Sequence, residues 1–372
     1  MEQVDFIVVG AGIAGMSAAA RLAGHGSVVV CEMEDAPGVH SSGRSAAFAH
    51  FDMDAPVVRA LTAASMPFFE EPAAHIHPAL FIALEGQEAA LDRVEANYRE
   101  WSATVERLSV AEARTLVPVL REGEGGIIGA VLDRAGRKLD AHAMLEGHRK
   151  SLSAAGGKLA TGAAVTSLRR EGGRWLVETA KGAWSARVVI NAAGAWVDEV
   201  ATMAGVTPIG ISPLRRTVIT FDAPEGLDVS AWPFTKTVGP GFYIEPEGRG
   251  RLLACPMDEN PTEPCDAQPE EEDIALAAWR VEEATTLQIR RLASKWAGLR
   301  SFVPDRRPVA GFHPDAPGFF WLAGQGGFGL QTSPAMALAV EAVATGSEWP
   351  EELRAVGVDE AALSPERFAS SM

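Results

Sequence analysis

Apolar residues occur along this chain in two arrangements, as short continuous runs and as longer stretches with helical spacing. Residues 5–9 form the first short run, and a glycine-rich turn follows it directly. A helical stretch over 16–23 and a second apolar run at 27–31, which ends in Glu32, complete the pattern. Strand, glycine turn, helix, strand and acid in this order are typical of a βαβ unit that binds a dinucleotide.

Each glycine of the first turn has a physical role in this interpretation. Gly10 allows a tight turn, Gly12 lets the backbone approach a pyrophosphate, and Gly15 lets the helix pack closely on the strand. The helix N-terminus presents free N–H groups and the positive end of its dipole to phosphates. Glu32 can accept hydrogen bonds from the hydroxyls of a ribose. The residues of the turn that we expect at the dinucleotide are Gly10, Gly12, Ile13, Ala14 and Gly15.

The rest of the chain alternates between the same two arrangements. The pattern predicts helices over 55–69, 86–101, 110–116, 140–155, 196–204, 269–293 and 334–345. Short apolar runs predict strands within 123–138, at 158–159, 163–165, 175–179 and 187–190, within 213–255 and at 319–323. The helix over 269–293 has acids at its start and Arg290 and Arg291 at its end, which suits the helix dipole.

The chain has 372 residues, of which 47% are hydrophobic, and a formal net charge of −16. This length favours two domains, and the charge argues against partners such as nucleic acid or an anionic membrane surface. No basic leader and no apolar stretch of about 18 residues is visible, so we expect a cytoplasmic protein without a membrane span. The three cysteines have neither metal nor disulfide spacing; we expect Cys31 in a buried strand and Cys255 and Cys265 at the surface.

Three strand ends that carry glycine are spread over the chain, at 10–15, 191–196 and 323–329. An NAD dehydrogenase would use one fingerprint half followed by a separate catalytic domain. The spread favours an α/β fold in which a Rossmann-like FAD-binding domain with a mixed or parallel sheet is assembled from discontinuous segments. An α+β substrate domain with an antiparallel sheet is then inserted between them. The predicted segments are 1–75, 138–208 and 298–372 for the FAD-binding domain and 76–137 and 209–297 for the substrate domain.

Several segments resemble the D-amino-acid oxidase superfamily of FAD enzymes, which includes glycine and sarcosine oxidases, and within it the bacterial D-arginine dehydrogenases. The resemblance extends over nearly the whole chain. It is carried by residues 10–15 with Glu32 and by residues 42–47, 59–65, 191–196, 282–287, 296–300 and 326–332.

The resemblance implies non-covalent FAD, because no cysteine matches the position of covalent attachment in some sarcosine oxidases. It places Arg44 and Ser45 at the phosphates and the flavin edge, and the backbone of Val165 at the adenine. The loop 326–332 would direct N–H groups and a helix N-terminus at the flavin N1–C2=O edge, where reduced flavin is negative. The implied cofactor residues are Arg44, Ser45, Ala46, Ala47, Val165, Ala193, Gly194, Trp196, Gly326, Gly327, Gly329, Leu330, Gln331 and Thr332.

The resemblance also implies a substrate site at which Arg300 grips a carboxylate as a fork. Arg216 would supply a second cation, with Arg215 as an alternative register, and the hydroxyl of Tyr243 a further donor. Two purely structural alternatives stay open. In one, Arg215 and Arg216 are a solvated pair, and in the other Tyr243 only packs in a sheet. Tyr98 is expected on a surface helix.

The implied reaction is oxidative deamination of an amino acid. A hydride passes from Cα to flavin N5, and water hydrolyses the imino acid to a 2-oxo acid and ammonia. The residues that we expect to carry this reaction are Arg300, Tyr243, Arg216 and Gly327. His40 and His50 are expected in structural or solvated roles.

The sequence departs from the D-arginine enzymes where the side-chain pocket is expected. Phe48, Met53 and Ala79 stand where those enzymes have polar or aromatic residues and an acid, and Asp52 and Asp54 are expected to point elsewhere. Burying an unpaired cation costs several kcal/mol. We therefore expect a neutral, apolar D-amino acid as the small-molecule substrate.

Other activities stay open at this point. They are a sarcosine- or glycine-oxidase-like amine oxidase, a 2-hydroxy acid oxidase, a flavin-carrying subunit of a larger dehydrogenase and, more distantly, an NAD enzyme. The electron acceptor, which would be oxygen, a quinone or another molecule, is open too.

Overall fold

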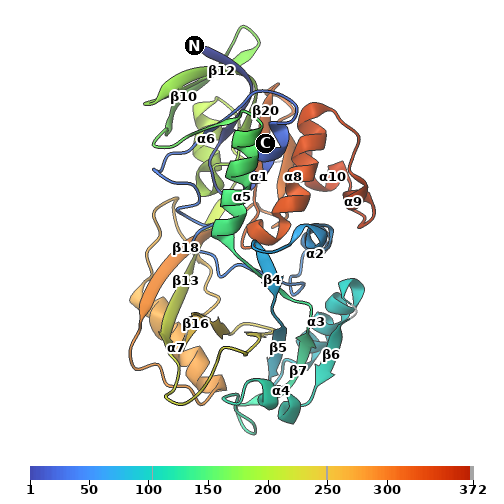
Figure 1. Ribbon diagram of the computed structural model, residues 1–372, viewed down its shortest axis with the longest axis vertical. Helices are drawn as coiled ribbons and strands as arrows, with labels where there is room; N and C mark the ends of the chain where they lie inside the picture. The colour runs from blue at the N-terminus through green and yellow to red at the C-terminus, as the bar shows by residue number, and fades with distance from the viewer. Residues whose placement is uncertain (103, 249, 369–372) are drawn as a thin grey trace.

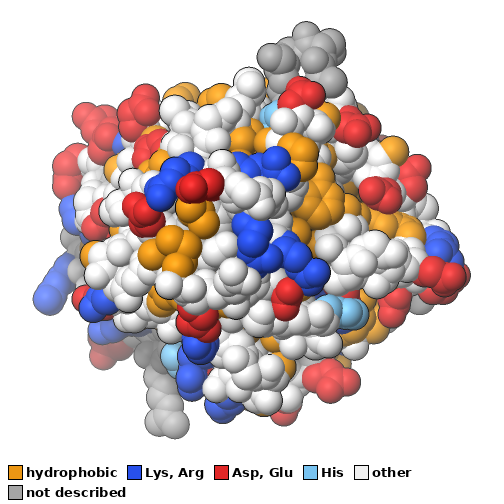
Figure 2. Space-filling view, turned by 90° about the horizontal axis from the view of Figure 1, so that it is seen from above, with side chains coloured by type: hydrophobic (Ala, Val, Ile, Leu, Met, Phe, Trp, Pro, Cys, Tyr) orange, Lys and Arg blue, Asp and Glu red, His pale blue; other side chains and the backbone are white. Residues whose placement is uncertain are grey.

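The computed structural model describes residues 1–102, 104–248 and 250–368. Two lobes, each built around a β-sheet, lie one above the other in Figure 1, and both chain ends lie in the upper lobe. This arrangement of a mixed sheet and a second, largely antiparallel sheet confirms the predicted fold class. Figure 2 looks down on the upper lobe and shows acidic and basic side chains mixed on that face.

The first sheet has eight strands. Its central order is β10-β11-β12-β1-β2-β9, with β20 paired to β12 and β19 paired to β20. The strands are β1 (Glu2–Val9), β2 (Val28–Cys31), β9 (Lys158–Ala160), β10 (Val165–Glu171), β11 (Arg174–Thr179), β12 (Gly182–Asn191), β19 (Val309–Phe312) and β20 (Phe319–Ala323). Strands β1, β2, β9, β12 and β20 run parallel where they pair, so their carboxyl ends meet at one edge.

Helices cover both faces of this sheet because alternate residues of β1 are apolar on both sides. Phe6 and Val8 pack into a core with α1 (Ile13–Leu22) and α8 (Gly329–Thr345), while Ile7 and Val9 pack into a second core with α6 (Val197–Met203). On the α1 side the cover also includes α2 (Pro56–Ser65), η1 (Met66–Phe68), α5 (Ala141–Ala154), α9 (Glu351–Arg354) and α10 (Glu360–Leu363). The short helices η2 (Gly194–Trp196) and η3 (Pro365–Phe368) complete the lobe.

The second sheet has nine strands in the order β17-β13-β16-β15-β14-β5-β7-β6, with β18 paired to β13. The strands are β5 (Ala79–Leu84), β6 (Val105–Leu108), β7 (Ile127–Asp133), β13 (Ser212–Asp222), β14 (Phe234–Thr237), β15 (Tyr243–Pro246), β16 (Arg251–Cys255), β17 (Asn260–Pro261) and β18 (Ser294–Phe302). Its helices are α3 (Glu88–Trp101), α4 (Val110–Leu116) and α7 (Glu271–Ala284). A small sheet of β3 (Phe48–Ala49), β8 (Arg137–Leu139) and β4 (Ala74–Ile76) lies between the lobes.

The sheets draw on the chain segments that the sequence assigns to the two domains, although β18 runs across the predicted boundary at 298. The exact domain limits stay a prediction. No helix among the described residues is long and apolar enough to cross a membrane.

Two predicted helices have wrong ends. The helix predicted over 269–293 ends at Ala284, because Thr285 turns extended and forms a bridge with Leu120. Its last turn consequently carries no base, and Arg290 and Arg291 lie outside it. Helix α8 begins at Gly329, five residues before the predicted start at Pro334.

Pro334 is tolerated inside α8 because its neighbours satisfy the groups that a proline leaves unpaired. The carbonyl of Leu330 would normally accept from residue 334, and the hydroxyl of Ser333 donates to it instead at 3.0 Å. The amide of Ala335 donates to the hydroxyl of Ser65 on α2. The helix therefore starts at the glycine loop itself.

Two predictions of exposure are also wrong. Tyr98 lies on α3 as expected but is fully buried, and its hydroxyl accepts a hydrogen bond from the amide of Phe51. Cys255 is buried at the end of β16, whereas Cys265 is exposed as predicted. Cys31 is buried as predicted, and burial raises the pKa of its thiol to about 12.

An ion pair joins the small sheet to the second sheet. Lys138 on β8 lies 2.6 Å from the carboxylate of Glu245 on β15, which is only 1% exposed. Burial raises the pKa of Glu245, and the neighbouring ammonium opposes that rise. Breaking a buried pair leaves a charge without compensation.

We predict that Lys138→Met lowers the free energy of unfolding by about 3 kcal/mol or more. The double variant Lys138→Met/Glu245→Gln removes both charges and is expected to recover most of that loss. Chemical denaturation of the wild type and both variants measures this. A double variant as unstable as the single one would contradict the explanation.

Candidate active site

One cavity of about 1110 Å³ takes its walls from both lobes. This volume is slightly above the range of most ligand sites, which suits an extended dinucleotide together with a small substrate. One end lies at the carboxyl edge of the first sheet, beside Glu32 and Val165. The other end lies on the second sheet, beside Tyr243 and Arg300.

The first glycine turn has the geometry that the sequence predicts. Gly10 has a φ of +101°, and a Cβ there would lie 2.6 Å from the carbonyl oxygen of Ala192. A Cβ on Gly15 would lie 2.0 Å from the carbonyl oxygen of Gly10. Gly12 stands at the start of α1 without a side chain to cap it, and the amide of Ile13 in the first turn donates to the hydroxyl of Ser42 at 2.9 Å. Gly12, Ile13 and Ala14 line the cavity.

Glu32 is held in place by backbone amides. Its two carboxylate oxygens accept hydrogen bonds from Ala11 at 2.6 Å and from Glu34 at 3.0 Å. The side chain is 7% exposed and forms part of the cavity wall. A carboxylate has about four lone-pair sites, so capacity for ribose hydroxyls is left.

The structure brings most of the predicted cofactor residues to this one cavity. Those that line it are Gly10, Gly12, Ile13, Ala14, Glu32, Arg44, Ser45, Ala46, Ala47, Val165, Ala193, Gly194, Trp196, Gly326, Gly327, Gly329, Leu330 and Gln331. Gly15 and Thr332 lie behind the wall, where Gly15 packs on Gly10 and the hydroxyl of Thr332 donates within α8.

Arg44 also ties the two lobes together, which the sequence did not indicate. Its guanidinium donates to the carbonyl oxygens of Val39, Ala267 and Ala297 and to the carboxylate of Asp266. Four of the five N–H groups of an arginine are thus used within the protein. At most one is left for a phosphate.

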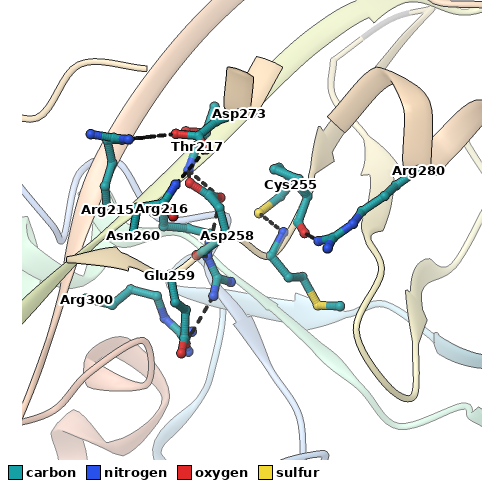
Figure 3. A network of polar contacts seen from close by, with 12 residues as sticks. Arg215, Arg216, Thr217, Cys255, Asp258, Glu259, Asn260, Asp273, Arg280 and Arg300 are labelled. Carbon is teal, nitrogen blue, oxygen red and sulfur yellow. Dashed lines mark hydrogen bonds and ion pairs between the residues drawn. The ribbon is translucent and has the colours of Figure 1, made fainter. Parts of the chain in front are cut away.

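Two arginines from adjacent strands meet at the other end of the cavity. Arg216 on β13 and Arg300 on β18 both lie against the carboxylate of Glu259, as Figure 3 shows. Arg215, the alternative in the sequence analysis, points away and pairs with Glu270 and Asp273. Arg216 lines the cavity and Arg215 does not.

Burial and the like charge of Arg216 lower the pKa of Arg300 to about 9, against the opposing effect of Glu259. The Arg300 guanidinium lies between two aromatic rings, with its central carbon 5.3 Å from the ring centre of Phe302 and 5.1 Å from that of Phe328. Within the described part of the chain its one hydrogen bond goes to Glu259. Nε and Nη2 have no acceptor among the described residues, and this edge of the guanidinium lies against Gly327, so an anion bound there shares the edge with the glycine backbone.

Tyr243 lines the cavity and leans on the ring of Phe234. Burial raises its pKa well above the ordinary value, so the hydroxyl is protonated at neutral pH and can donate a hydrogen bond. Cys255 contributes to that rise from the adjacent strand β16.

Two of the three residues predicted for the side-chain pocket line the cavity. Phe48 stacks on Phe234 with ring centres 4.4 Å apart, and Met53 lies nearby in the wall. Ala79 is fully buried in β5 and lies outside the wall. Asp52 and Asp54 also lie in the wall, contrary to the expectation that they point elsewhere, and Asp52 is paired with Lys236.

Sequence patterns do not mark Glu259 and Lys236 as site residues. Both are single charged residues, Lys236 within the predicted β-rich region 213–255 and Glu259 just beyond it. No spacing or motif marks them, because their place depends on the pairing of distant strands. One signal for Glu259 was available. The sequence predicts two arginines at the carboxylate site, and buried arginines need an acidic partner.

Gly327 has a steric role beside Arg300. A Cβ on this glycine would lie 1.9 Å from Nε and 2.0 Å from Nη2 of the arginine. We predict that Gly327→Ala displaces the guanidinium and weakens the binding of propionate about tenfold or more, because hydrogen bonds to charged groups contribute about 1.5–3 kcal/mol.

Isothermal titration calorimetry with propionate measures this loss. Gly147→Ala is the matched control, because no atom lies within 4 Å of the place of its Cβ on α5. Unchanged affinity in Gly327→Ala would show that Arg300 does not need this space.

His50 lines the cavity between Phe234 and Phe328. Burial, together with the nearby cations Lys236 and Arg300, lowers the pKa of its ring to about 3. The ring is therefore neutral at physiological pH, which suits the structural role expected for it.

This shift makes the folded state sensitive to acid. Between pH 6.5 and about 3 the unfolded chain binds the proton and the folded chain does not, so stability is lost as the pH falls through this window. We predict that Tm falls less between pH 7 and pH 5 in His50→Gln than in the wild type. The exposed His142→Gln is the control. An equal fall of Tm in all three proteins would show that His50 is not the source of the acid sensitivity.

Comparisons with known proteins agree with the fold and indicate FAD as the cofactor. A family model described as FAD dependent oxidoreductase (DAO) matches residues 5–342. FAD-dependent oxidoreductase domain-containing protein 1 of Bos taurus is 29% identical over 170 residues, which are 41% of this chain and 34% of the bovine protein. The match thus spans about a third of that relative. Glycine oxidase of Pseudomonas putida is 26% identical over 376 residues, with 92% of this chain and 94% of that protein covered.

Two solved structures have the same fold at low sequence identity. Glycine oxidase from Geobacillus kaustophilus has a TM-score of 0.84 at 22% identity, with 99% of each chain covered. L-proline dehydrogenase from P. horikoshii also has a TM-score of 0.84, at 20% identity, with 100% of this chain and 99% of the other covered.

Proposed function

This chain belongs to the family of FAD dependent oxidoreductases, and from that premise we propose that it oxidises a neutral D-amino acid to the 2-oxo acid and ammonia. The family and its neighbours indicate a flavin enzyme that acts on amines or amino acids. The D configuration, the neutral side chain and the individual residue roles are our proposal.

The observation that carries the proposal is which residues lie at the two ends of the cavity. The glycine turn and Glu32 form a dinucleotide cradle at one end. At the other end Arg300, Arg216 and the hydroxyl of Tyr243 offer donors for a carboxylate. A small amino acid held there by its carboxylate would lie between these donors and a flavin.

FAD is the cofactor that fits this cradle. The first turn of α1 would hold the pyrophosphate, and the first turn of α8 would direct its N–H groups at the flavin ring. We propose that the cofactor is not covalently attached. Among the described residues Cys31 is the one cysteine in the cavity wall, and it lies beside Glu32 with a raised pKa.

When bound, FAD supplies the acceptor for the hydride from Cα. The protein supplies orientation, because Arg300 grips the carboxylate while Phe48 and Met53 provide apolar walls for the side chain. Lys236 is neutralised by Asp52, so this pair offers no free acid to a substrate cation. A neutral side chain therefore fits the pocket better than the cation of arginine or lysine.

The test is anaerobic reduction of the bound flavin by a panel of substrates. Reduction is measured as the loss of the flavin's visible absorbance. We expect D-leucine to reduce it faster than D-arginine, L-leucine, glycine, sarcosine and D-lactate. Repetition in air with detection of peroxide identifies oxygen or another acceptor. Comparable kcat/KM for D-leucine and D-arginine would refute the neutral side chain, and preference for sarcosine or glycine would favour an amine oxidase.

We predict that Arg300→Gln lowers kcat/KM for the best substrate roughly a hundredfold, because a charged hydrogen bond to the carboxylate is lost. The control Arg291→Gln removes an exposed arginine outside the cavity and is expected to act within a few-fold of the wild type. Equal activities of the two variants would remove Arg300 from the site.

A further inference from the structure

We propose that Glu259 determines substrate specificity by setting the charge of the carboxylate site. Its carboxylate reduces the charge of the site so that it accepts a substrate with one carboxylate and disfavours a dicarboxylate. This inference rests on the proposed function.

Glu259 lies at the centre of three arginines. Its Oε1 lies 2.5 Å from Nη1 of Arg300 and 3.3 Å from Nη2 of Arg216, and its Oε2 lies 2.9 Å from Nη2 of Arg306. The first two arginines are largely buried in the cavity wall, whereas Arg306 is half exposed at its edge. Figure 3 shows the carboxylate between Arg216 and Arg300.

The residues beside Glu259 are anchored to β13, which holds its own side chain in place. Both carboxylate oxygens of Asp258 accept from the amide of Thr217, at 2.9 and 3.0 Å. Asn260 pairs with Arg215 in the sheet, and its side chain donates to Asp273 at 2.7 Å. Glu259 thus lies between two fixed points of the backbone.

Arg306 holds the carboxylate from the opposite side. Its Nη2 donates to both oxygens of Glu259, and its guanidinium lies 3.7 Å from the ring centre of Phe302. Arg300 donates one hydrogen bond to Glu259, and its other N–H groups have no acceptor among the described residues. The substrate carboxylate and Glu259 can therefore bind Arg300 at the same time, on different N–H groups.

The balance of charge follows from these contacts. Arg216, Arg300 and Arg306 carry three positive charges, and Glu259 cancels one of them. Arg306 is half exposed at the cavity edge, where solvent screens its charge, so the buried pair keeps one uncompensated charge, which matches one carboxylate. A second carboxylate in the same cavity would meet no second uncompensated charge from this pair and would be repelled by Glu259.

The test compares propionate with succinate, which is propionate with a second carboxylate on its terminal carbon. Each anion is titrated into the flavin-bound protein, and the perturbation of the flavin spectrum gives Kd. Glu259→Gln and Glu259→Ala remove the charge in two ways, so a folding defect of one variant does not decide the outcome. Glu259→Asp keeps the charge, and Glu263→Gln removes a charge from the same loop outside the cavity wall.

We expect both charge-removing variants to bind both anions more tightly than the wild type. The Kd of succinate is expected to fall about tenfold more than the Kd of propionate. Glu259→Asp and Glu263→Gln are expected to keep the wild-type preference. Equal tightening of both anions would overturn the inference, because Glu259 would then merely compete for Arg300, and the proposed function would stand. Failure of propionate to bind the wild type would refute the carboxylate site itself, and the inference with it.

Discussion

The pairing of β13 with β18 is the constraint on which the candidate site depends. Arg216 lies opposite Gly298, and Arg300 lies opposite Leu214, so the two arginines stand diagonally on the same face of adjacent strands. Arg215 faces the other way and pairs with Asp273. Because side chains alternate along a strand, a slip of one residue would exchange the cavity arginine for its neighbour. The register of one strand pair therefore decides which cations meet the ligand.

The same strand pair brings the two lobes into contact. The side chain of Trp296 on β18 donates to the carbonyl oxygen of Arg44, and Arg44 in turn donates to the carbonyl oxygen of Ala297. A segment from the cofactor end is thus attached to the strand that carries Arg300. The proposed reaction would need this attachment, because cofactor and substrate must be held at a defined distance for hydride transfer. Glycines at the crowded points, above all Gly327, leave room for the guanidinium.

Electrostatics at the site depends on pairs that are distant in sequence. Lys236 on β14 is balanced by Asp52, and Arg300 on β18 is partly balanced by Glu259. Each pair lowers the cost of burying a cation, and each also changes what a ligand meets in the cavity. The motif residues alone would suggest a strongly positive pocket. The structure has a pocket of small net charge with a few donors left free.

The sequence by itself determined the parts of this protein that are encoded locally. The glycine turn at 10–15, the acid at Glu32 and the helices predicted over 86–101 and 140–155 follow from patterns within short segments, and the structure has these helices over 88–101 and 141–154. Tertiary structure alone decided the end of α7 at Ala284, the burial of Tyr98 and Cys255, and the positions of Arg44 and Glu259. These depend on which strands pair and in which register. Such pairing is a property of contacts between segments far apart along the chain, which local patterns do not record.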